Sequence, residues 1–236
     1  MKLGEVMKRI AVIPARSGSK GLCDKNIIDL CGEPLMAYSI KAALKTNLFD
    51  AVIVSTDSKK YGKIAKSFGA EVMYRDQKLS NDLASTYMVL EDFLNRIELG
   101  IDYFVLLQPT SPMRNDTHIN EAVHLFDDHI SDYDFLVSVK EAEHVQSLVK
   151  PIGEDGSLKY FNENYADYRR QAHVEYSPNG AIFMGKPKEY LQQKHFFGPR
   201  SLAYKMSKLD SIDIDDEIDY ELACLCMQKR LELCCK

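Results

Sequence analysis

Short apolar runs of strand length alternate with helical stretches over about the first 140 residues, and this alternation constrains the fold more than any other feature. The runs are rich in Val and Ile, as buried parallel strands are, and they predict strands at residues 9–15, 51–56, 71–74, 103–108 and 135–139. Apolar residues at helical spacing predict helices at residues 35–45, 59–68, 85–99 and 118–129. We therefore expect an α/β fold of three layers, α/β/α, in which helices cover both faces of a mainly parallel, Rossmann-like sheet.

The alternation stops near residue 140. Residues 140–178 are polar and interrupted by turn residues, and we interpret them as an inserted arm that packs on a second subunit. Strand character returns at residues 180–184 and 202–205, and an amphipathic last helix begins at Asp216 or Glu217. The predicted organisation is a core of residues 1–139 and 179–236 with an arm of residues 140–178.

Bulk composition excludes several functional classes. A net charge of −5 leaves no general basic field for nucleic acid, so an anionic ligand must be held locally. No apolar run approaches the roughly 18 residues of a membrane span, and no signal peptide is expected. The six cysteines lack paired C-x-x-C spacing, which favours reduced thiols in the cytoplasm; those near the carboxyl end could instead bind a soft metal.

The first predicted strand leads into an unusual loop, IPARSGSKGLCDKN, at residues 13–26. Gly18 and Gly21 allow a sharp turn in which several backbone N–H groups point into one concavity, a nest that suits phosphate oxygens. Arg16 adds a rigid fork for two oxygens, while Lys20 and Lys25 add point charges. The loop matches neither the P-loop nor the dinucleotide glycine pattern, so the alternatives are a different phosphate site or a solvated basic loop.

The loop and five later blocks together resemble one family, the CMP-sialic acid synthetases or acylneuraminate cytidylyltransferases. The blocks follow the family order and cover nearly the whole chain: ARSGSKGL with KN, VIVSTD (52–57), Arg75 with LASTY (83–87), LLQPTSPMR (106–114), PNGAIF (178–183) and SIDIDDEID (211–219). The resemblance implies a nucleotide-diphosphosugar transferase fold, which agrees with the alternation of strands and helices. It also implies an enzyme, a nucleotidyltransferase, that works as a homodimer.

The implied reaction joins CTP and a nonulosonic acid, N-acylneuraminate, to give the CMP-sugar and diphosphate. The anomeric hydroxyl of the sugar would attack the α-phosphate in line, with Mg²⁺ as cofactor and Mn²⁺ as a substitute. By resemblance Lys25, Arg16, Asp213 and Asp215 are catalytic. The implied nucleotide-binding residues are Ala15, Arg16, Ser19, Lys20, Lys25, Asn26, Arg75, Ala84 and Thr86.

Asp213 and Asp215 also predict a metal site from their spacing. Residues two apart on an extended segment point to the same side, so both carboxylates would face one ligand. Two acids beside a bound triphosphate suit Mg²⁺, which prefers hard oxygens and keeps several waters. Asp216, Glu217 and Asp219 continue the acidic run, and we interpret them as favourable charge at the start of the last helix.

The resemblance places the sugar beside Gln108, Arg169, Asn179, Phe196 and Phe197. Arg170 competes with Arg169 for its role, and the two phenylalanines could instead be ordinary core residues. The chain departs from the family after EAEH (141–144), where relatives often carry H-P-L-K and this chain continues VQSLVK. Lys150 could replace the missing lysine, or the sugar could differ.

Two alternatives to the leading function remain open at this level. The same chemistry could act on legionaminic or pseudaminic acid, or the chain could be a catalytically silent nucleotide-binding homologue. Lys25, Asp213 and Asp215 are all present, so the sequence gives no sign of a decayed site.

Overall fold

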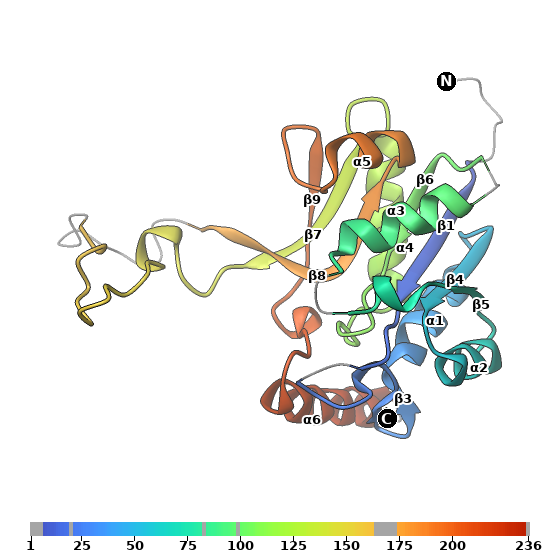
Figure 1. The fold of residues 1–236 in the computed structure, drawn as a ribbon, viewed down its shortest axis with the longest axis horizontal. Coiled ribbons are helices and arrows are strands. Elements are labelled where there is room, and N and C mark those ends of the chain that lie inside the picture. Colours follow the sequence, from blue (N-terminus) through green and yellow to red (C-terminus); the bar gives the residue numbers. More distant parts are fainter. Residues whose placement is uncertain (1–6, 19–20, 82–83, 98–99, 163–173, 235–236) are drawn as a thin grey trace.

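A computed structural model describes residues 7–18, 21–81, 84–97, 100–162 and 174–234. Its centre is a seven-stranded sheet in the order β5-β4-β1-β6-β8-β7-β9 (Figure 1). The strands are β1 (Arg9–Pro14), β4 (Ala51–Thr56), β5 (Glu71–Tyr74), β6 (Tyr103–Leu106), β7 (Phe135–Glu141), β8 (Tyr176–Gly185) and β9 (Ser201–Lys205). These strands occupy the predicted positions, with ends that differ by a few residues.

The sheet is mostly parallel, with one antiparallel strand inside it. β5, β4, β1 and β6 run parallel to one another, and β9 runs parallel to β7. β8 lies antiparallel between β6 and β7. β8 begins at Tyr176, four residues before the predicted start, because it stays paired with β7 as far as Glu141, at the base of the arm.

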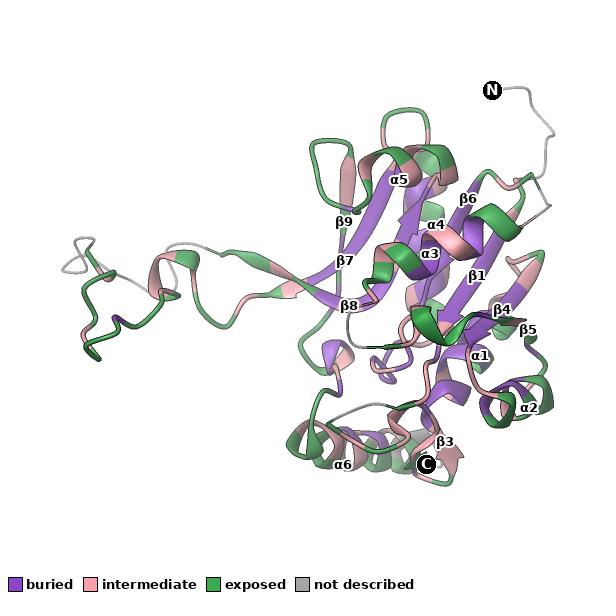
Figure 2. Ribbon diagram, in the orientation of Figure 1, coloured by how far each residue is buried: buried purple, intermediate pink, exposed green. Residues whose placement is uncertain are grey.

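Helices cover both faces of the sheet, because alternate residues of each strand point to opposite sides. Ala11 and Ile13 of β1 pack in the cluster that includes α1 (Leu35–Thr46), α2 (Lys59–Ser67) and α4 (Asp116–Asp128). Ile10 and Val12 face the other cluster, with α3 (Thr86–Arg96) and α5 (Pro187–Gln193). Figure 2 shows the strands as the buried centre of this sandwich. The predicted three-layer fold class is confirmed.

A smaller apolar cluster lies below the sheet, where the last helix α6 (Glu217–Cys234) packs against the short hairpin of β2 (Asp29–Leu30) and β3 (Glu33–Pro34). Leu30 and Leu35 meet Ile212 and Ile214 in this cluster. The segment before α6 is thereby fixed beneath the sheet edge. No helix of the described residues is long and apolar enough to cross a membrane.

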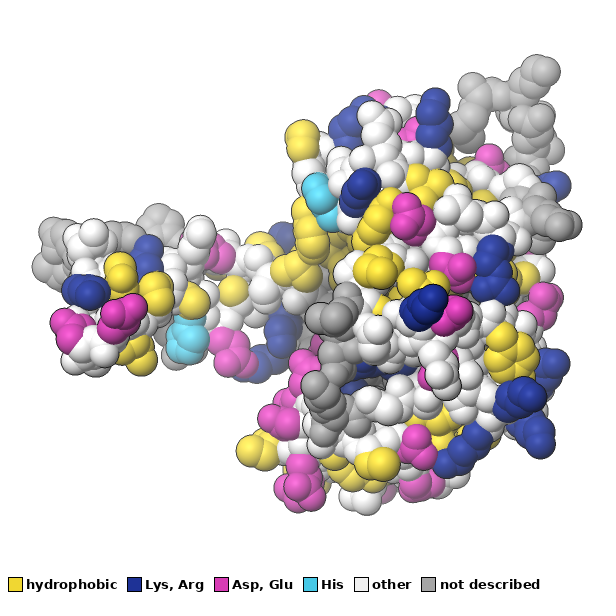
Figure 3. All heavy atoms as spheres, in the orientation of Figure 1, with side chains coloured by type: hydrophobic (Ala, Val, Ile, Leu, Met, Phe, Trp, Pro, Cys, Tyr) yellow, Lys and Arg dark blue, Asp and Glu magenta, His cyan; other side chains and the backbone are white. Residues whose placement is uncertain are grey.

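β7 and β8 continue beyond the core as the base of an arm. Figure 1 shows the chain between them reaching far from the body of the molecule. The described part of this arm exposes large apolar side chains, and Figure 3 shows apolar groups gathered along it. They are Val149, Ile152, Leu158, Tyr160, Val174 and Tyr176.

Asp134 ties three strands together at the end of the sheet opposite the arm. Its carboxylate accepts a hydrogen bond from Lys186, which follows β8, at 2.7 Å, and others from Arg200, which precedes β9. These hydrogen bonds lower the pKa of Asp134 to about 2 from its ordinary 3.8, and those from Arg200 have a larger effect than the one from Lys186.

We expect Asp134→Asn to lower the free energy of unfolding by about 1–2 kcal/mol at neutral pH. A depressed carboxyl pKa stabilises the folded state above about pH 4, and that contribution disappears as the pH falls through about 2. The difference between wild type and variant should therefore shrink in acid. Urea unfolding at several pH values tests this, with the exposed Glu71→Gln as control. A pH-independent difference would contradict the assignment.

Candidate functional site

Loops that follow β1, β4, β5 and β6 meet at the carboxyl edge of the sheet, where ligands bind in open α/β folds. There they form a cleft of about 440 Å³. We call it the charged cleft, because it joins basic side chains from the first half of the chain to acidic ones from the end. Its walls include Arg16, Gly21, Lys25, Asn26, Arg75, Ala84, Thr86, Gln108, Asp213 and Asp215.

The glycine-containing loop after β1 is fixed at both ends. Ser17 donates from its N–H and its hydroxyl to the carboxylate of Asp57, at 2.9 and 2.6 Å. Asn26 is buried, and its side-chain amide donates to the carbonyl of Arg16 at 2.9 Å. Gly18, with φ +77°, makes the left-handed turn that the sequence predicts. The described residues at the two ends of the loop are thus held in place beside the cleft.

The cleft gathers positive charge. Arg75 is buried and donates to the hydroxyls of Ser80 and Ser55, at 2.9 and 3.4 Å. Burial lowers the pKa of Arg75; Asp57 opposes this shift, and the nearby charge of Arg16 adds to it. Two guanidinium groups that repel each other in one cleft are stabilised by an anion between them. The arrangement therefore suits a phosphate chain.

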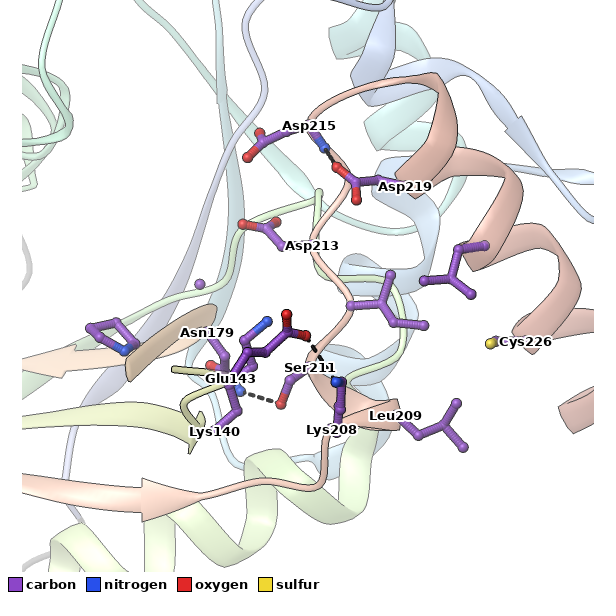
Figure 4. Close-up of a pocket in the computed structure, with 14 residues that line it drawn as sticks. Lys140, Glu143, Asn179, Lys208, Leu209, Ser211, Asp213, Asp215, Asp219 and Cys226 are labelled. Atoms are coloured by element: carbon purple, nitrogen blue, oxygen red, sulfur yellow. Dashed lines mark hydrogen bonds and ion pairs between the residues drawn. The ribbon is translucent and has the colours of Figure 1, made fainter. Parts of the chain in front are cut away.

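The acidic segment enters the cleft from the opposite side. Ile212 and Ile214 are buried in the lower cluster, so the alternate residues Asp213 and Asp215 face outward. Figure 4 shows both carboxylates projecting to the same side of the chain, as the spacing predicts. Lys25 reaches this segment, donating to the carbonyl of Ile214 at 2.8 Å and approaching Asp215 Oδ1 at 3.3 Å.

Asp213 occupies the more enclosed of the two positions. Burial raises the pKa of Asp213. A hydrogen bond from Thr110 and the positive charge of Lys25 act in the opposite direction and lower it. Its carboxylate also accepts a hydrogen bond from Ser111, at 3.4 Å. A Cβ at Gly180 would lie 3.0 Å from Asp213 Oδ2 and 2.8 Å from Gln108 Oε1, so glycine is required there, and its φ of +78° needs it too.

The donor set fits a hard divalent cation. Among the described residues no group of three or more His, Cys, Asp or Glu side chains could form a complete protein cage. Mg²⁺ does not need one, because it is commonly held by one or two carboxylates with substrate phosphates and water. Asp213 and Asp215 are two such carboxylates, and they lie in the same cleft as the basic side chains.

Asp219 has a different role from the pair. Its carboxylate accepts hydrogen bonds from the N–H groups of Asp215 and Asp216, at 3.0 and 3.3 Å, while its own N–H donates to Asp216 at 3.0 Å. These reciprocal bonds start α6, which begins at Glu217. The prediction that Asp216 and Asp219 serve the helix start agrees with this geometry.

Gln108 and Thr86 line both the charged cleft and a second cavity of about 300 Å³, which we call the aromatic cavity. The loop of Gln108 is held by the buried Arg114, which donates to the carbonyls of Gln108 and Ala181 at 3.2 and 3.1 Å and to the hydroxyl of Ser39 at 2.6 Å. The cavity is lined by Ser85, Thr86, Tyr87, Leu106, Gln108, Phe183, Tyr190, Lys194, His195, Phe196 and Phe197.

The predicted phenylalanine pair divides between two environments. Phe196 is 5% exposed and packs against Phe183 and Tyr190, with ring centroids 5.0 and 4.6 Å apart. Phe197 is 49% exposed at the rim. Phe196 is therefore part of both the apolar core and the cavity wall. The sequence left open whether the two phenylalanines line a sugar site or belong to the core, and the position of Phe196 is compatible with both.

A third cavity, of about 720 Å³, lies on the other side of the acid pair, between the base of the arm and α6 (Figure 4). Asn179 is buried in its wall. The amide of Asn179 donates to Ser211 at 2.8 Å and accepts from Ser138 at 2.5 Å. These bonds tie β8 to β7 and to the acidic segment, an arrangement that favours a supporting role for this predicted sugar-binding residue.

Three predicted site residues, Ser19, Lys20 and Arg169, lie outside the described residues. Sequence reasoning did not assign Asp57 or Thr110, which hold the glycine loop and Asp213. Both residues follow strands, β4 and β6, that end at the same edge of the sheet. This shared position is the sequence feature that could have identified them as site residues. The remaining predicted residues of the nucleotide site do meet in one cleft, with Ala15 buried beside it.

Comparison with known proteins agrees with this geometry. A family model described as cytidylyltransferase matches residues 10–232. The chain belongs to the cytidylyltransferase family. The N-acylneuraminate cytidylyltransferase of Escherichia coli O18:K1:H7 is 47% identical over 94% of this chain and 53% of that protein. The chain thus spans about half the length of that relative.

Two further likenesses extend the comparison. The pseudaminic acid cytidylyltransferase of Campylobacter jejuni serotype O:2 is 32% identical over 92% of this chain and 95% of that protein. A solved structure of CMP:2-keto-3-deoxy-manno-octonic acid synthetase, complexed with CTP, superposes with a TM-score of 0.71 at 16% identity and covers 94% of this chain and 99% of that one. The second likeness shows a shared fold.

Gly21 leaves no room for a side chain between the two halves of this cytidylyltransferase-family site, because a Cβ there would lie 2.8 Å from the backbone oxygen of Asp215. We expect Gly21→Ala to push the basic loop away from the acidic segment and to destabilise the fold by about 1–3 kcal/mol. Thermal unfolding measures the change. Gly100→Ala, which meets nothing within 4 Å, is the control and should unfold like wild type. Equal midpoints for all three proteins would contradict the contact.

Proposed function

We propose that this chain is a cytidylyltransferase that joins CTP and N-acylneuraminate to form CMP-N-acylneuraminate and diphosphate. The observation that carries the proposal is the charged cleft of about 440 Å³, which Arg16, Lys25 and Arg75 line together with Asp213 and Asp215. The 47% identity to an N-acylneuraminate cytidylyltransferase, against 32% to a pseudaminic acid enzyme, supports the choice of sugar acid.

The triphosphate would bind along the basic wall. Arg16 and the N–H groups of the glycine loop would bind phosphate oxygens, and the predicted Ser19 and Lys20 belong to the same loop. Arg75, Ala84 and Thr86 line the same cleft and would hold the cytosine and ribose. The contacts that fix Ser17 and Asn26 at the ends of the loop would lower the entropic cost of binding.

The chemistry would take place between Lys25 and the acid pair. Lys25 is 15% exposed and held against Ile214, so its ammonium is positioned to neutralise charge that develops on the reacting phosphates and the departing diphosphate. Asp213 and Asp215 would hold Mg²⁺, or Mn²⁺ in its place. When bound, the metal would polarise the α-phosphate and favour ionisation of the incoming hydroxyl. Positioning and charge neutralisation supply most of the rate in such transfers.

We expect Lys25→Ala and Asp213→Asn to lose at least about a hundredfold in turnover while they remain folded. The assay follows diphosphate release from CTP and Mg²⁺ with N-acetylneuraminic, legionaminic, pseudaminic and 3-deoxy-manno-octulosonic acids. N-acetylneuraminic acid should give the highest kcat/KM.

The matched controls are Lys66→Ala and Glu221→Gln, which remove the same charges from exposed surface and should keep wild-type rates. Release with none of the acids, while CTP still binds, would replace the proposal with a silent nucleotide-binding homologue. Highest activity with another acid would reassign the substrate.

We also propose that the chain functions as a homodimer through its arm. An arm that leaves the body and exposes several large apolar side chains cannot bury them in its own core (Figures 1 and 3). The same arm of a second copy, or its body, would cover them. The predicted Arg169 lies within the arm's sequence, so a partner could complete the sugar site. The free thiols of Cys23, Cys31, Cys224 and Cys226 support a reducing, cytoplasmic compartment.

We expect Ile152→Asp with Leu158→Asp to shift the protein from dimer to monomer at micromolar concentration, because a charge in a packed apolar contact is costly. Both side chains are more than 60% exposed in the single chain, so the fold should survive. Sedimentation velocity measures the state, and Glu154→Gln on the same arm is the control. A wild-type protein that sediments as a monomer would refute the dimer.

A further inference from the structure

The lining of the aromatic cavity includes one positively charged side chain to which the proposed function assigns no role. Its described lining holds aromatic rings, the amide of Gln108 and no carboxylate. Its single lysine is Lys194. A cavity of about 300 Å³ with apolar walls and a few polar groups is typical of a small-molecule site.

The main chain at Lys194 is fixed at the end of α5, and the residue is exposed. It ends α5 in the left-handed conformation, with φ +69°, and its N–H donates to the carbonyl of Tyr190 at 2.7 Å. Its ammonium lies 5.4 Å from the ring centroid of Tyr87, another residue of the cavity wall. Among the described residues no carboxylate lies within ion-pair distance of it. The charge therefore remains available to a ligand.

We propose that Lys194 binds the carboxylate of the sugar acid and so determines the preference for acidic sugars. The inference rests on the proposed function, whose substrate brings a carboxylate and an acyl group together. The carboxylate would pair with the ammonium of Lys194, while the acyl group packs on Phe196 and Phe197. Gln108, which borders both cavities, would hold the sugar with its anomeric hydroxyl toward the charged cleft.

The other lysines near the acid pair suit this role less well. Lys150, the substitute suggested by the sequence, lies on the arm and is not among the residues lining the aromatic cavity of its own chain. Lys208 is already paired with Glu143 at 2.8 Å, as Figure 4 shows. Lys140 lines the third cavity and offers a matched comparison.

The test compares Lys194→Met, Lys194→Arg and Lys140→Met in steady-state kinetics. Methionine keeps most of the apolar stem and removes the charge. Losing a charge-assisted contact should raise the KM for the sugar acid about tenfold or more in Lys194→Met, with the KM for CTP within about twofold. Lys194→Arg should recover much of the affinity, and Lys140→Met should resemble wild type.

A second substrate isolates the carboxylate contact. The carboxamide of the sugar acid keeps its shape and loses its charge, so wild type should prefer the acid, and Lys194→Met should not. Retained preference in Lys194→Met, or the loss appearing in Lys140→Met instead, would overturn the inference while the proposed function stands. If wild type releases diphosphate with no sugar acid, the proposed function fails and this inference fails with it.

Discussion

The contact between the glycine loop and the acidic segment determines this site. The two backbones lie so close that a Cβ at Gly21 would be 2.8 Å from the backbone oxygen of Asp215, and Lys25 bridges them through the carbonyl of Ile214. Charges of opposite sign are held across a narrow space without neutralising one another completely, because Asp215 is mostly exposed and Arg16 and Arg75 repel each other. A polyanion with a bound cation satisfies both walls at once, and the site is preorganised for that combination.

The fold stabilises this arrangement from outside the cleft. The lower apolar cluster anchors Ile212 and Ile214, the buried Arg114 holds the loop of Gln108, and Asn179 joins β7, β8 and the acidic segment. These side chains contact the site from behind, so they can fix its geometry without touching a ligand. The rigid sheet edge thus holds the charged loops in position, and the loops provide the groups that would contact a ligand.

Much of the fold and part of the site could be predicted from local pattern. The apolar runs placed six of the seven strands closely, and the spacing of Asp213 and Asp215 predicted that their carboxylates point to the same side. The direction of β8, the fixing of Ser17 by Asp57 and the pairing of Asp134 with Lys186 and Arg200 could not be predicted, since each joins residues tens of positions apart. Lys194 gave no signal either, because its role depends on which cavity the end of α5 borders.

The sequence by itself determined the class of fold, the basic glycine loop and the orientation of the two aspartates, because periodicity and residue spacing are local properties. Only the tertiary structure decided that the loop and the aspartates share one cleft and that Gln108 borders both this cleft and an aromatic cavity. It also decided that Lys194 lines the aromatic cavity without a partner carboxylate among the described residues. The glycine loop and the acidic segment are almost 200 residues apart in the sequence. They meet because the sheet, its helices and α6 pack together, and this packing cannot be inferred from either segment alone.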